Sequence, residues 1–178
     1  MMKIDGAINK LDKFDKKGIH VFTKRDLRRL FFEDTDTGFK QSVTRLVRRN
    51  ILEQPVKGVY VYVLSKNKGR RMIEMIASAL RKYDYNYVSL ESALSQYGAI
   101  SQIPIDRITI MTTGRKGIFK TPYGVIEFTH TKRDPLDIID NTIKTDHPLR
   151  IATPEAAFRD LKRVGRNINM VDRRVLNE

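Results

Sequence analysis

The sequence has 178 residues, with 34 Lys and Arg against 21 Asp and Glu, so that its net charge is +13 and its isoelectric point lies near 10.0. This excess of cations favours a polyanionic partner such as DNA, RNA or an anionic membrane surface, without choosing among them. The lack of cysteine excludes disulfides, thiolate metal sites and a cysteine nucleophile. There is also no apolar run long enough to span a bilayer and no signal or transit pattern at the amino terminus, so we expect a cytoplasmic protein with no membrane partner.

The first predicted element is a helix over residues 3–14. Its apolar residues recur three or four positions apart, which places them on one side of a helix: Ile4, Ala7, Ile8, Leu11 and Phe14. Residues 15–18, with the sequence DKKG, end this helix, and residues 19–22 form a short extended link. His20 lies between apolar neighbours in that link. A single histidine in such a position is more often structural than functional, and we expect the same here.

A second helix is predicted over residues 24–32. Thr23 is placed to cap its amino end, and Leu27, Leu30 and Phe31 share the side that would be buried. Residues 33–38, with the sequence EDTDTG, then form a turn. Either Asp36 or Thr37 could cap the helix that follows.

The third predicted helix, residues 39–47, has the most informative pattern. One stripe is apolar and consists of Phe39, Val43, Leu46 and Val47. The remaining side of this helix and its end has four cations, two short polar groups and no carboxylate: Lys40, Gln41, Thr44, Arg45, Arg48 and Arg49. A surface of this kind suits phosphates with base edges between them. The alternative is an amphipathic helix whose basic face is only solvated.

Two runs rich in β-branched and aromatic residues follow, at 51–54 and 59–63, around the turn Pro55-Val56-Lys57-Gly58. Helix, turn, basic helix and hairpin in this order predict a winged helix-turn-helix domain that binds DNA. We expect Lys40, Gln41 and Arg45 to reach base edges, with Thr44 as a further contact. Contacts to backbone phosphates are expected from Lys24, Arg28, Arg48, Arg49 and Lys57.

The composition then indicates a domain boundary. We predict a DNA-binding domain over 1–64, a linker over 65–69 and a second domain over 70–178, because residues 64–69 are polar and contain Gly. The second domain is predicted to begin with a helix over 70–82. A further helix is expected over 90–97, with Ser89 as its cap and Gly98 as the residue that ends it.

Strand-type patterns dominate the next part of the sequence. Residues 107–113, 117–121 and 125–131 predict three strands of a small antiparallel sheet. A polar loop is expected at 134–148, before a last helix that begins at Thr153 with Pro154 in its first position. Residues 165–178 have only weak periodicity. The predicted fold class is therefore α+β, with a winged helix-turn-helix domain followed by a small mixed α/β domain with an antiparallel sheet.

The second domain also has cations in its loops. Five of them form a possible second basic surface: Arg115, Lys116, Lys120, Lys132 and Arg133. This surface could extend the DNA footprint or contact another macromolecule, and scattered solubilising charge is an equal alternative.

Evidence for catalysis is weak. A metal-dependent nuclease needs an acid and a lysine that converge on one cation, and Glu127 with Lys132 or Lys120 is the nearest candidate. The three histidines, at positions 20, 130 and 147, share no metal-ligand spacing. We therefore expect no enzyme activity, no cofactor and no metal, with a nuclease or an RNA- or toxin-binding module as the alternatives.

Four blocks, in order, resemble the AbiEi family of antitoxins from type IV abortive-infection toxin–antitoxin systems. They are SVTRLVRRNILEQPVKGVYVYV, YNYVSLESALSQYGAISQIP, ITIMTTGRKGIFKTPYGVIEFTH and IATPEAAFRDLKRVG, and the likeness extends from about Phe22 to Gly165. At Asn50 the family often has Gly. This is a mild change, because Asn also tolerates a left-handed backbone.

The resemblance implies a regulator of phage defence with two activities. Its amino-terminal domain would repress its own operon by binding inverted repeats in double-stranded operator DNA. Its carboxy-terminal domain would counteract a cognate nucleotidyltransferase-like toxin, without forming a stable complex with it. Both activities are expectations from the resemblance and not from the composition.

Overall fold

The computed structural model describes residues 1–101 and 105–177. They form two compact units, Met1–Met72 and Ile73–Glu178, and the chain belongs to the α+β class. None of the helices in the described parts of the chain combines the length and apolar composition needed to cross a membrane.

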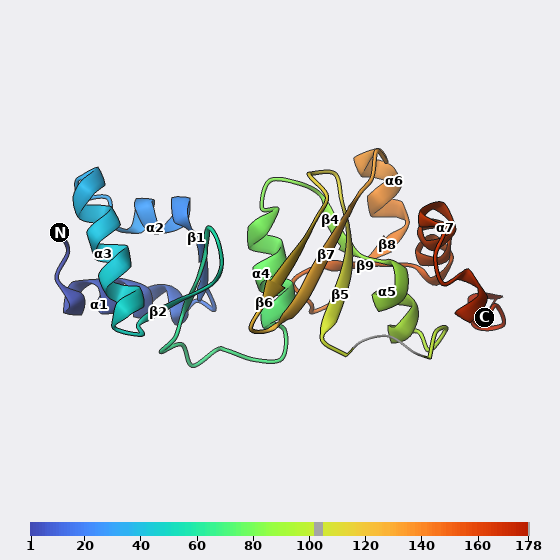
Figure 1. The fold of residues 1–178 in the computed structure, drawn as a ribbon, viewed down its shortest axis with the longest axis horizontal. Coiled ribbons are helices and arrows are strands. Elements are labelled where there is room, and N and C mark those ends of the chain that lie inside the picture. Colours follow the sequence, from blue (N-terminus) through green and yellow to red (C-terminus); the bar gives the residue numbers. More distant parts are fainter. Residues whose placement is uncertain (102–104, 178) are drawn as a thin grey trace. The chain divides into compact units, whose positions relative to one another are not determined.

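Unit 1 contains three helices and a three-stranded antiparallel sheet (Figure 1). In chain order these elements are α1 (Ile4–Asp15), β1 (Val21–Thr23), α2 (Lys24–Leu30), α3 (Asp36–Arg48), β2 (Leu52–Val56) and β3 (Val59–Tyr62). The strand order is β1-β3-β2. The sequence predicted the helices and the hairpin, but β1 was expected only as a link. It is a strand because Phe22 lies opposite Tyr60 and the edge of β3 completes its hydrogen bonds.

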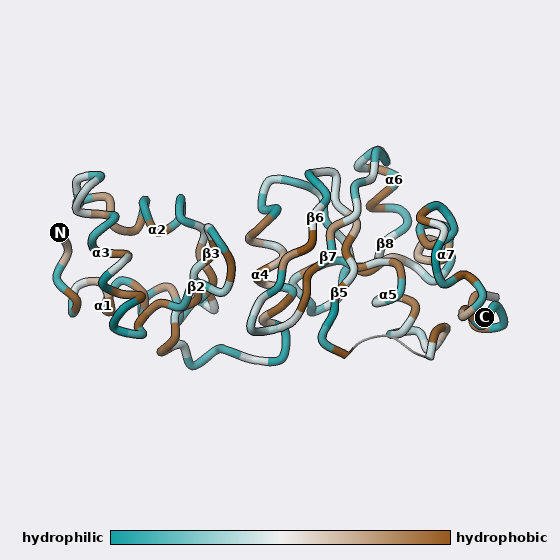
Figure 2. The backbone as a smooth tube through the Cα atoms, viewed as in Figure 1, coloured by the Kyte–Doolittle hydropathy of each residue, from teal (hydrophilic) through white to brown (hydrophobic). Residues whose placement is uncertain are grey.

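The three helices and the sheet of unit 1 enclose one apolar core. The buried residues of this core are Ala7, Leu11, Phe22, Leu27, Phe31, Phe39, Val43, Leu46, Ile51, Leu52, Tyr60 and Tyr62. The backbone accordingly alternates between hydrophilic and hydrophobic stretches along these elements (Figure 2). His20 is also buried, and its backbone carbonyl accepts a hydrogen bond from the backbone N–H of Tyr62.

Side-chain caps fix where α2 and α3 begin. Thr23 accepts a hydrogen bond from the backbone N–H of Asp26, whose carboxylate accepts one from the N–H of Thr23, so the predicted cap is a full capping box. For α3 the prediction was wrong. The cap is Thr35, whose Oγ1 lies 3.1 Å from the N–H of Gly38, because the helix begins at Asp36 and not after it.

Asn50 ends α3 in a left-handed conformation, with φ of 56°. The N–H of Ile51 bonds to the carbonyl of Leu46, and the N–H of Asn50 bonds to that of Val47. This is a Schellman motif, in which Asn takes the place that Gly most often fills. The turn lets the chain reverse directly into β2.

The residues predicted as a linker are attached to α1. The backbone N–H of Lys66 and the side chain of Ser65 both donate to the carboxylate of Asp15, and Asn67 donates to its carbonyl and carboxylate. Burial alone would raise the pKa of Asp15, but these hydrogen bonds lower it below its ordinary value. Residues 65–67 are therefore part of unit 1.

Unit 2 is built on a six-stranded sheet with the order β6-β7-β5-β4-β9-β8 (Figure 1). Its elements are α4 (Met72–Leu80), β4 (Asn86–Val88), α5 (Leu90–Gln96), β5 (Arg107–Thr112), β6 (Gly117–Thr121), β7 (Gly124–His130), α6 (Pro135–Asp140), β8 (Thr142–Ile143), β9 (Arg150–Ala152), α7 (Pro154–Val164), and the short 3₁₀ helices η1 (Ile168–Met170) and η2 (Val175–Asn177).

The prediction of a small antiparallel sheet is wrong, because the sheet has six strands and two of its strand pairs are parallel. β5 pairs with β7 in parallel, and β4 pairs with β9 in parallel. The reason is the position of β6, which forms an antiparallel hairpin with β7 on the edge of β7 that faces away from β5. Because the chain reverses direction twice between β5 and β7, these two strands run parallel. The predicted polar loop at 134–148 is also wrong. It contains α6, capped by Asp134, and β8, which pairs with β9.

Helices cover both faces of this sheet. α4 lies on the face that contains Ile126 and Phe128, since Ile73 approaches Gly124 there and Arg81 stacks on Phe128. α5 and α7 pack together on the opposite face, where Thr109 bonds to the first turn of α5.

Asp160, on the buried side of α7, connects this helix to β4 and to the segment that follows β7. Its carboxylate is fully buried and accepts hydrogen bonds from the hydroxyls of Tyr87 (2.9 Å) and Ser89 (2.8 Å), as well as from the guanidinium of Arg133. Ser89 is the N-cap residue of α5 as predicted, but its hydroxyl bonds to Asp160 and makes no capping hydrogen bond to α5. Gly98 does end α5 as predicted, with φ of 72°.

Candidate nucleic-acid interface

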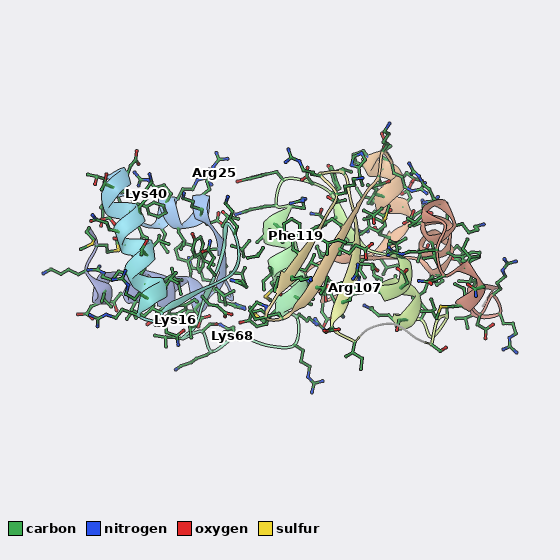
Figure 3. All side chains as sticks on the ribbon, in the orientation of Figure 1. Lys16, Arg25, Lys40, Lys68, Arg107 and Phe119 are labelled. Atoms are coloured by element: carbon green, nitrogen blue, oxygen red, sulfur yellow. The ribbon has the colours of Figure 1, made fainter. Side chains whose placement is uncertain are left out.

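The outer face of α3 is the feature most suited to a polyanion. Phe39, Val43 and Leu46 turn the opposite side of this helix into the core. The exposed stripe that remains consists of Thr37, Lys40, Gln41, Thr44 and Arg48, with Lys40 shown in Figure 3. Thr44 donates its hydroxyl hydrogen to the carbonyl of Lys40 (2.9 Å), which occupies the donor locally and leaves its methyl group on the surface. We call these five residues the α3 outer face.

Arg45 does not belong to this face, contrary to the sequence prediction. Its side chain is half-buried and donates to the backbone carbonyl of Met2. The N–H of Met2 in turn lies 3.2 Å from the hydroxyl of Ser42, so the segment before α1 lies along this side of α3. Periodicity in the sequence predicted that Arg45 points outward. It could not predict the contact with Met2, because periodicity does not show where the distant amino terminus packs.

A buried carboxylate holds the start of α3 in place. Asp34 accepts a hydrogen bond of 2.6 Å from Ser42, and the amino group of Met1 lies 3.3 Å from its other oxygen. Burial alone would raise the pKa of Asp34, but the hydrogen bonds and the nearby ammonium group lower it. Asp34 is therefore charged at neutral pH and binds α3 to the preceding turn.

Arg28, predicted to contact phosphate, is engaged between two helices. Its Nη2 lies 3.0 Å from Oδ1 of Asp36, and its guanidinium stands over the ring of Phe39. It thereby links α2 to the first turn of α3. Its charge is offset by that of Asp36, so it is a weaker phosphate contact than the sequence suggested.

The other predicted phosphate contacts are exposed. Lys24 begins α2, Arg49 follows α3, and Lys57 forms the two-residue turn of the β2–β3 hairpin with Gly58. The backbone N–H of Lys24 donates to the carbonyl of Gly58 (3.1 Å), so the hairpin turn and the start of α2 lie side by side. Lys24 and Lys57 therefore belong to one basic site on unit 1.

Charge is distributed unevenly between the units. Residues 1–72 contain 18 Lys and Arg and 8 Asp and Glu, a net charge of +10, whereas residues 73–178 contain 16 and 13, a net charge of +3. Most of the excess that favours a polyanion thus belongs to the smaller unit.

The second basic surface predicted from the sequence is divided in the structure. Arg115, Lys116 and Lys132 are exposed and lie at the end of the sheet where β5 and β7 finish. Lys120 lies toward the other end of β6, opposite Val125. Arg133 is mostly buried and pairs with Asp160 and Asp137. These five residues do not form one surface.

Glu127, the candidate nuclease acid, pairs with arginines and not with Lys120 or Lys132. Its two oxygens lie 2.6 Å from Arg166 and 2.6 Å from Arg107, and Arg166 also bonds to Glu91. Burial would raise the pKa of Glu127, but the two guanidinium groups lower it. Among residues 1–101 and 105–177, no three His, Asp or Glu side chains gather in a way that could hold a metal ion.

Comparisons with known proteins bear on the fold alone. No family model and no curated protein matches the chain. The chain is similar in fold to the RV2827C protein from Mycobacterium tuberculosis. The TM-score is 0.60 at 18% sequence identity, and the match covers 88% of this chain. The chain spans 60% of the length of that protein.

Sequence reasoning missed two further groups of residues. Arg166 lies in the tail for which no structure was predicted, and its ion pairs with Glu91 and Glu127 attach that tail to α5 and β7. Tyr83 and Tyr85 are 71% and 50% exposed. The signal for the tyrosines was present in the sequence, because Tyr83 and Tyr85 alternate with polar residues between the helices predicted over 70–82 and 90–97.

Proposed function

We propose that unit 1 is a winged helix and that it binds duplex DNA with α3 in the major groove. The order of its elements supports this proposal, since a helix, a strand, two helices and a hairpin follow one another as in that fold. The antiparallel order β1-β3-β2 also agrees with it. The hairpin is short, so its turn would contact the backbone and not reach far along a groove.

The observation that carries the proposal is the charge of the α3 outer face. Between Thr37 and Arg48, a stretch that the structure describes completely, there is no Asp or Glu. Lys40 and Gln41 lie in the first half of the helix, the part that approaches base edges in helix-turn-helix proteins. Gln pairs well with adenine, and the Thr44 methyl group suits the methyl group of thymine. Arg48 and Lys57 would neutralise phosphates.

We propose that the chain as a whole is an antitoxin and autorepressor of the AbiEi type. The support is the resemblance in sequence, together with the basic amino-terminal unit and the separate second unit. In this proposal unit 1 binds inverted repeats upstream of its own reading frame. Unit 2 counteracts a nucleotidyltransferase-like toxin without a stable complex.

A footprinting experiment tests the DNA part. Purified protein is titrated onto a duplex that contains the region upstream of its own gene, and cleavage protection is mapped. The proposal predicts two protected half-sites one or two helical turns apart. The Lys40→Ala/Gln41→Ala variant should lose this pattern. Equal protection of the upstream region and of an unrelated duplex would contradict sequence-specific binding.

Growth rescue tests the antitoxin part separately. The adjacent toxin gene is induced in a host together with the full chain or with Lys40→Ala/Gln41→Ala. Because unit 2 is proposed to neutralise the toxin, both proteins should restore growth. Failure of both would remove the antitoxin function and leave the DNA-binding proposal standing.

A further inference from the structure

Two exposed tyrosines lie at one end of the sheet in unit 2. Tyr83 and Tyr85 belong to the loop between α4 and β4, and their side chains are 71% and 50% exposed. An exposed tyrosine ring presents an apolar body and a polar hydroxyl, a combination that is enriched where proteins contact partners.

This loop is fixed to the loop between β5 and β6. The backbone N–H of Tyr85 donates to Oγ1 of Thr113 (3.0 Å), and the N–H of Thr113 donates to the carbonyl of Tyr85 (3.0 Å). The sheet register explains the contact, because Asn86 at the start of β4 lies opposite Thr112 at the end of β5. The two loops therefore form one surface.

The second loop adds cations next to the tyrosines. Arg115 and Lys116 are both exposed and follow Thr113 after one residue, Gly114. Lys132 is exposed and lies just beyond the end of β7 on the same side, since Thr131 donates to the carbonyl of Thr112. We call Tyr83, Tyr85, Arg115 and Lys116 the tyrosine–cation surface.

Arg81 connects this surface to aromatic residues of the sheet. Its guanidinium stacks over the rings of Phe119 (5.3 Å; labelled in Figure 3) and Phe128 (4.7 Å), and its Nε donates to the carbonyl of Arg115 (2.9 Å). Burial lowers the pKa of Arg81, Asp84 opposes that change, and the charge of Arg115 adds to it. Arg81 is thus bonded to the backbone of Arg115 and adds its own positive charge to this end of the sheet.

Asp84 is the acid at this site, and it packs against the backbone. A Cβ atom at Gly114 would overlap Oδ2 of Asp84, so the carboxylate occupies the space above the glycine. The absence of a side chain at Gly114 therefore allows the two loops to approach each other here. Asp84 is outnumbered by the cations of the two loops, which include Arg81, Arg115 and Lys116.

Exposed aromatic rings beside cations match the chemistry of unpaired nucleotides. Each base has a flat face that stacks on tyrosine, and each nucleotide adds a phosphate that a cation neutralises. A duplex hides its base faces, so it can use only the cations. We propose that the tyrosine–cation surface binds single-stranded nucleic acid, with bases stacked on Tyr83 and Tyr85 and phosphates on Arg115 and Lys116.

This site is independent of duplex binding by α3. It lies in the other unit, uses stacking and not groove contacts, and does not require that unit 1 bind DNA. Its most direct consequence is that the full chain has two nucleic-acid sites with different preferences, one for duplex and one for single strands.

Fluorescence anisotropy tests the proposal. The full chain is titrated onto labelled single-stranded RNA, single-stranded DNA and duplex DNA of one mixed sequence. We expect Tyr83→Ala/Tyr85→Ala to weaken binding of single strands by about tenfold or more, with duplex binding unchanged. Tyr83→Phe/Tyr85→Phe should stay within about twofold of the wild type, because stacking needs the ring and not the hydroxyl. The RNA and DNA arms identify which strand is preferred.

Two matched variants make the result specific. Arg115→Ala/Lys116→Ala should weaken single-strand binding and reduce its salt dependence, whereas Lys162→Ala/Arg163→Ala, which removes two cations from α7, should change neither. Lys40→Ala/Arg48→Ala should leave single-strand binding intact. The proposal is overturned if single strands bind equally well without the tyrosine rings, or if the α7 variant loses as much affinity as the loop variant.

Discussion

Nη2 of Arg28 lies 3.0 Å from Oδ1 of Asp36, so an ion pair joins α2 to the first turn of the helix proposed to read DNA. The Asp36 side chain is 90% exposed, and it is the carboxylate closest in sequence to the α3 outer face. The pair therefore places a negative charge where phosphates would approach.

Replacing Asp36 with Asn should strengthen duplex binding. The substitution removes this charge and frees Arg28 to contact phosphate. We expect affinity to rise by about threefold and the salt slope to steepen by about one. The stability of unit 1 should change by less than about 1 kcal/mol, since exposed ion pairs contribute little. Anisotropy titrations at several salt concentrations measure the slope; an unchanged or weaker affinity would mean that α3 does not face the duplex.

Gln41 and Arg45 should behave differently from each other. Gln41 is exposed on the outer face, so Gln41→Ala should relax base preference at one operator position by about 1–3 kcal/mol. Arg45 contacts Met2, so Arg45→Ala should lower stability and leave base preference intact. Competition with single-base operator variants distinguishes the two. If Arg45→Ala relaxed base preference instead, Arg45 would read DNA and would have to leave Met2 on binding.

Asp160 is expected to be the most sensitive residue of unit 2. Asp160→Ala leaves Arg133, Tyr87 and Ser89 without their buried acceptor, and we expect a loss of about 3–5 kcal/mol in the free energy of unfolding. Asp137→Ala is the matched control. It removes a partly exposed partner of the same arginine, at a cost of about 1 kcal/mol or less. Urea denaturation followed by circular dichroism measures both, and equal losses would refute the central place given to Asp160.

Glu127 should make stability depend on acidity. Its pKa is lower in the folded protein than its ordinary value of 4.5, because Arg166 and Arg107 stabilise the charged form. The contribution of Glu127 to the free energy of unfolding is therefore present above pH 4.5. It is lost as the pH falls through the lower pKa of the folded state. Glu127→Gln should be less stable at pH 7 and should show a shallower decline below pH 4.5. A parallel decline in both proteins would contradict the pairing. Asp15 and Asp34 retain their own acid dependence in either case.

Local signals in the sequence predicted much of unit 1 and the start of α7 in unit 2. The caps of α2 and α7, the apolar stripe of α3, the tolerance of Asn50 for a left-handed turn and the hairpin turn at Lys57 all depend on residues close in sequence. Such signals are readable because neighbouring residues satisfy the same backbone groups.

The α3 cap at Thr35 and the missed helix α6 are local failures, but the others involve partners distant in sequence. β1 is too short to be recognised without the edge of β3, and the parallel pairing of β5 with β7 follows from where β6 inserts. Arg45 left the predicted DNA face because Met2 packs beside it. Ser89 occupies its predicted cap position, but its hydroxyl donates to Asp160 and not to the first turn of α5. The pattern of polar and apolar residues in a sequence shows which side of a helix or strand is polar. It does not show which distant group will contact that side.

The salt dependence of duplex binding tests the central claim most directly. We would measure it for the wild type, for Lys40→Ala/Arg48→Ala on the α3 outer face, and for Lys16→Ala/Lys17→Ala, which removes two exposed cations that follow α1. The account predicts that the first variant binds more weakly, with a slope of log K against log salt reduced by about two, and that the second resembles the wild type. Equal slopes in all three proteins, or a loss confined to the Lys16 and Lys17 variant, would contradict it.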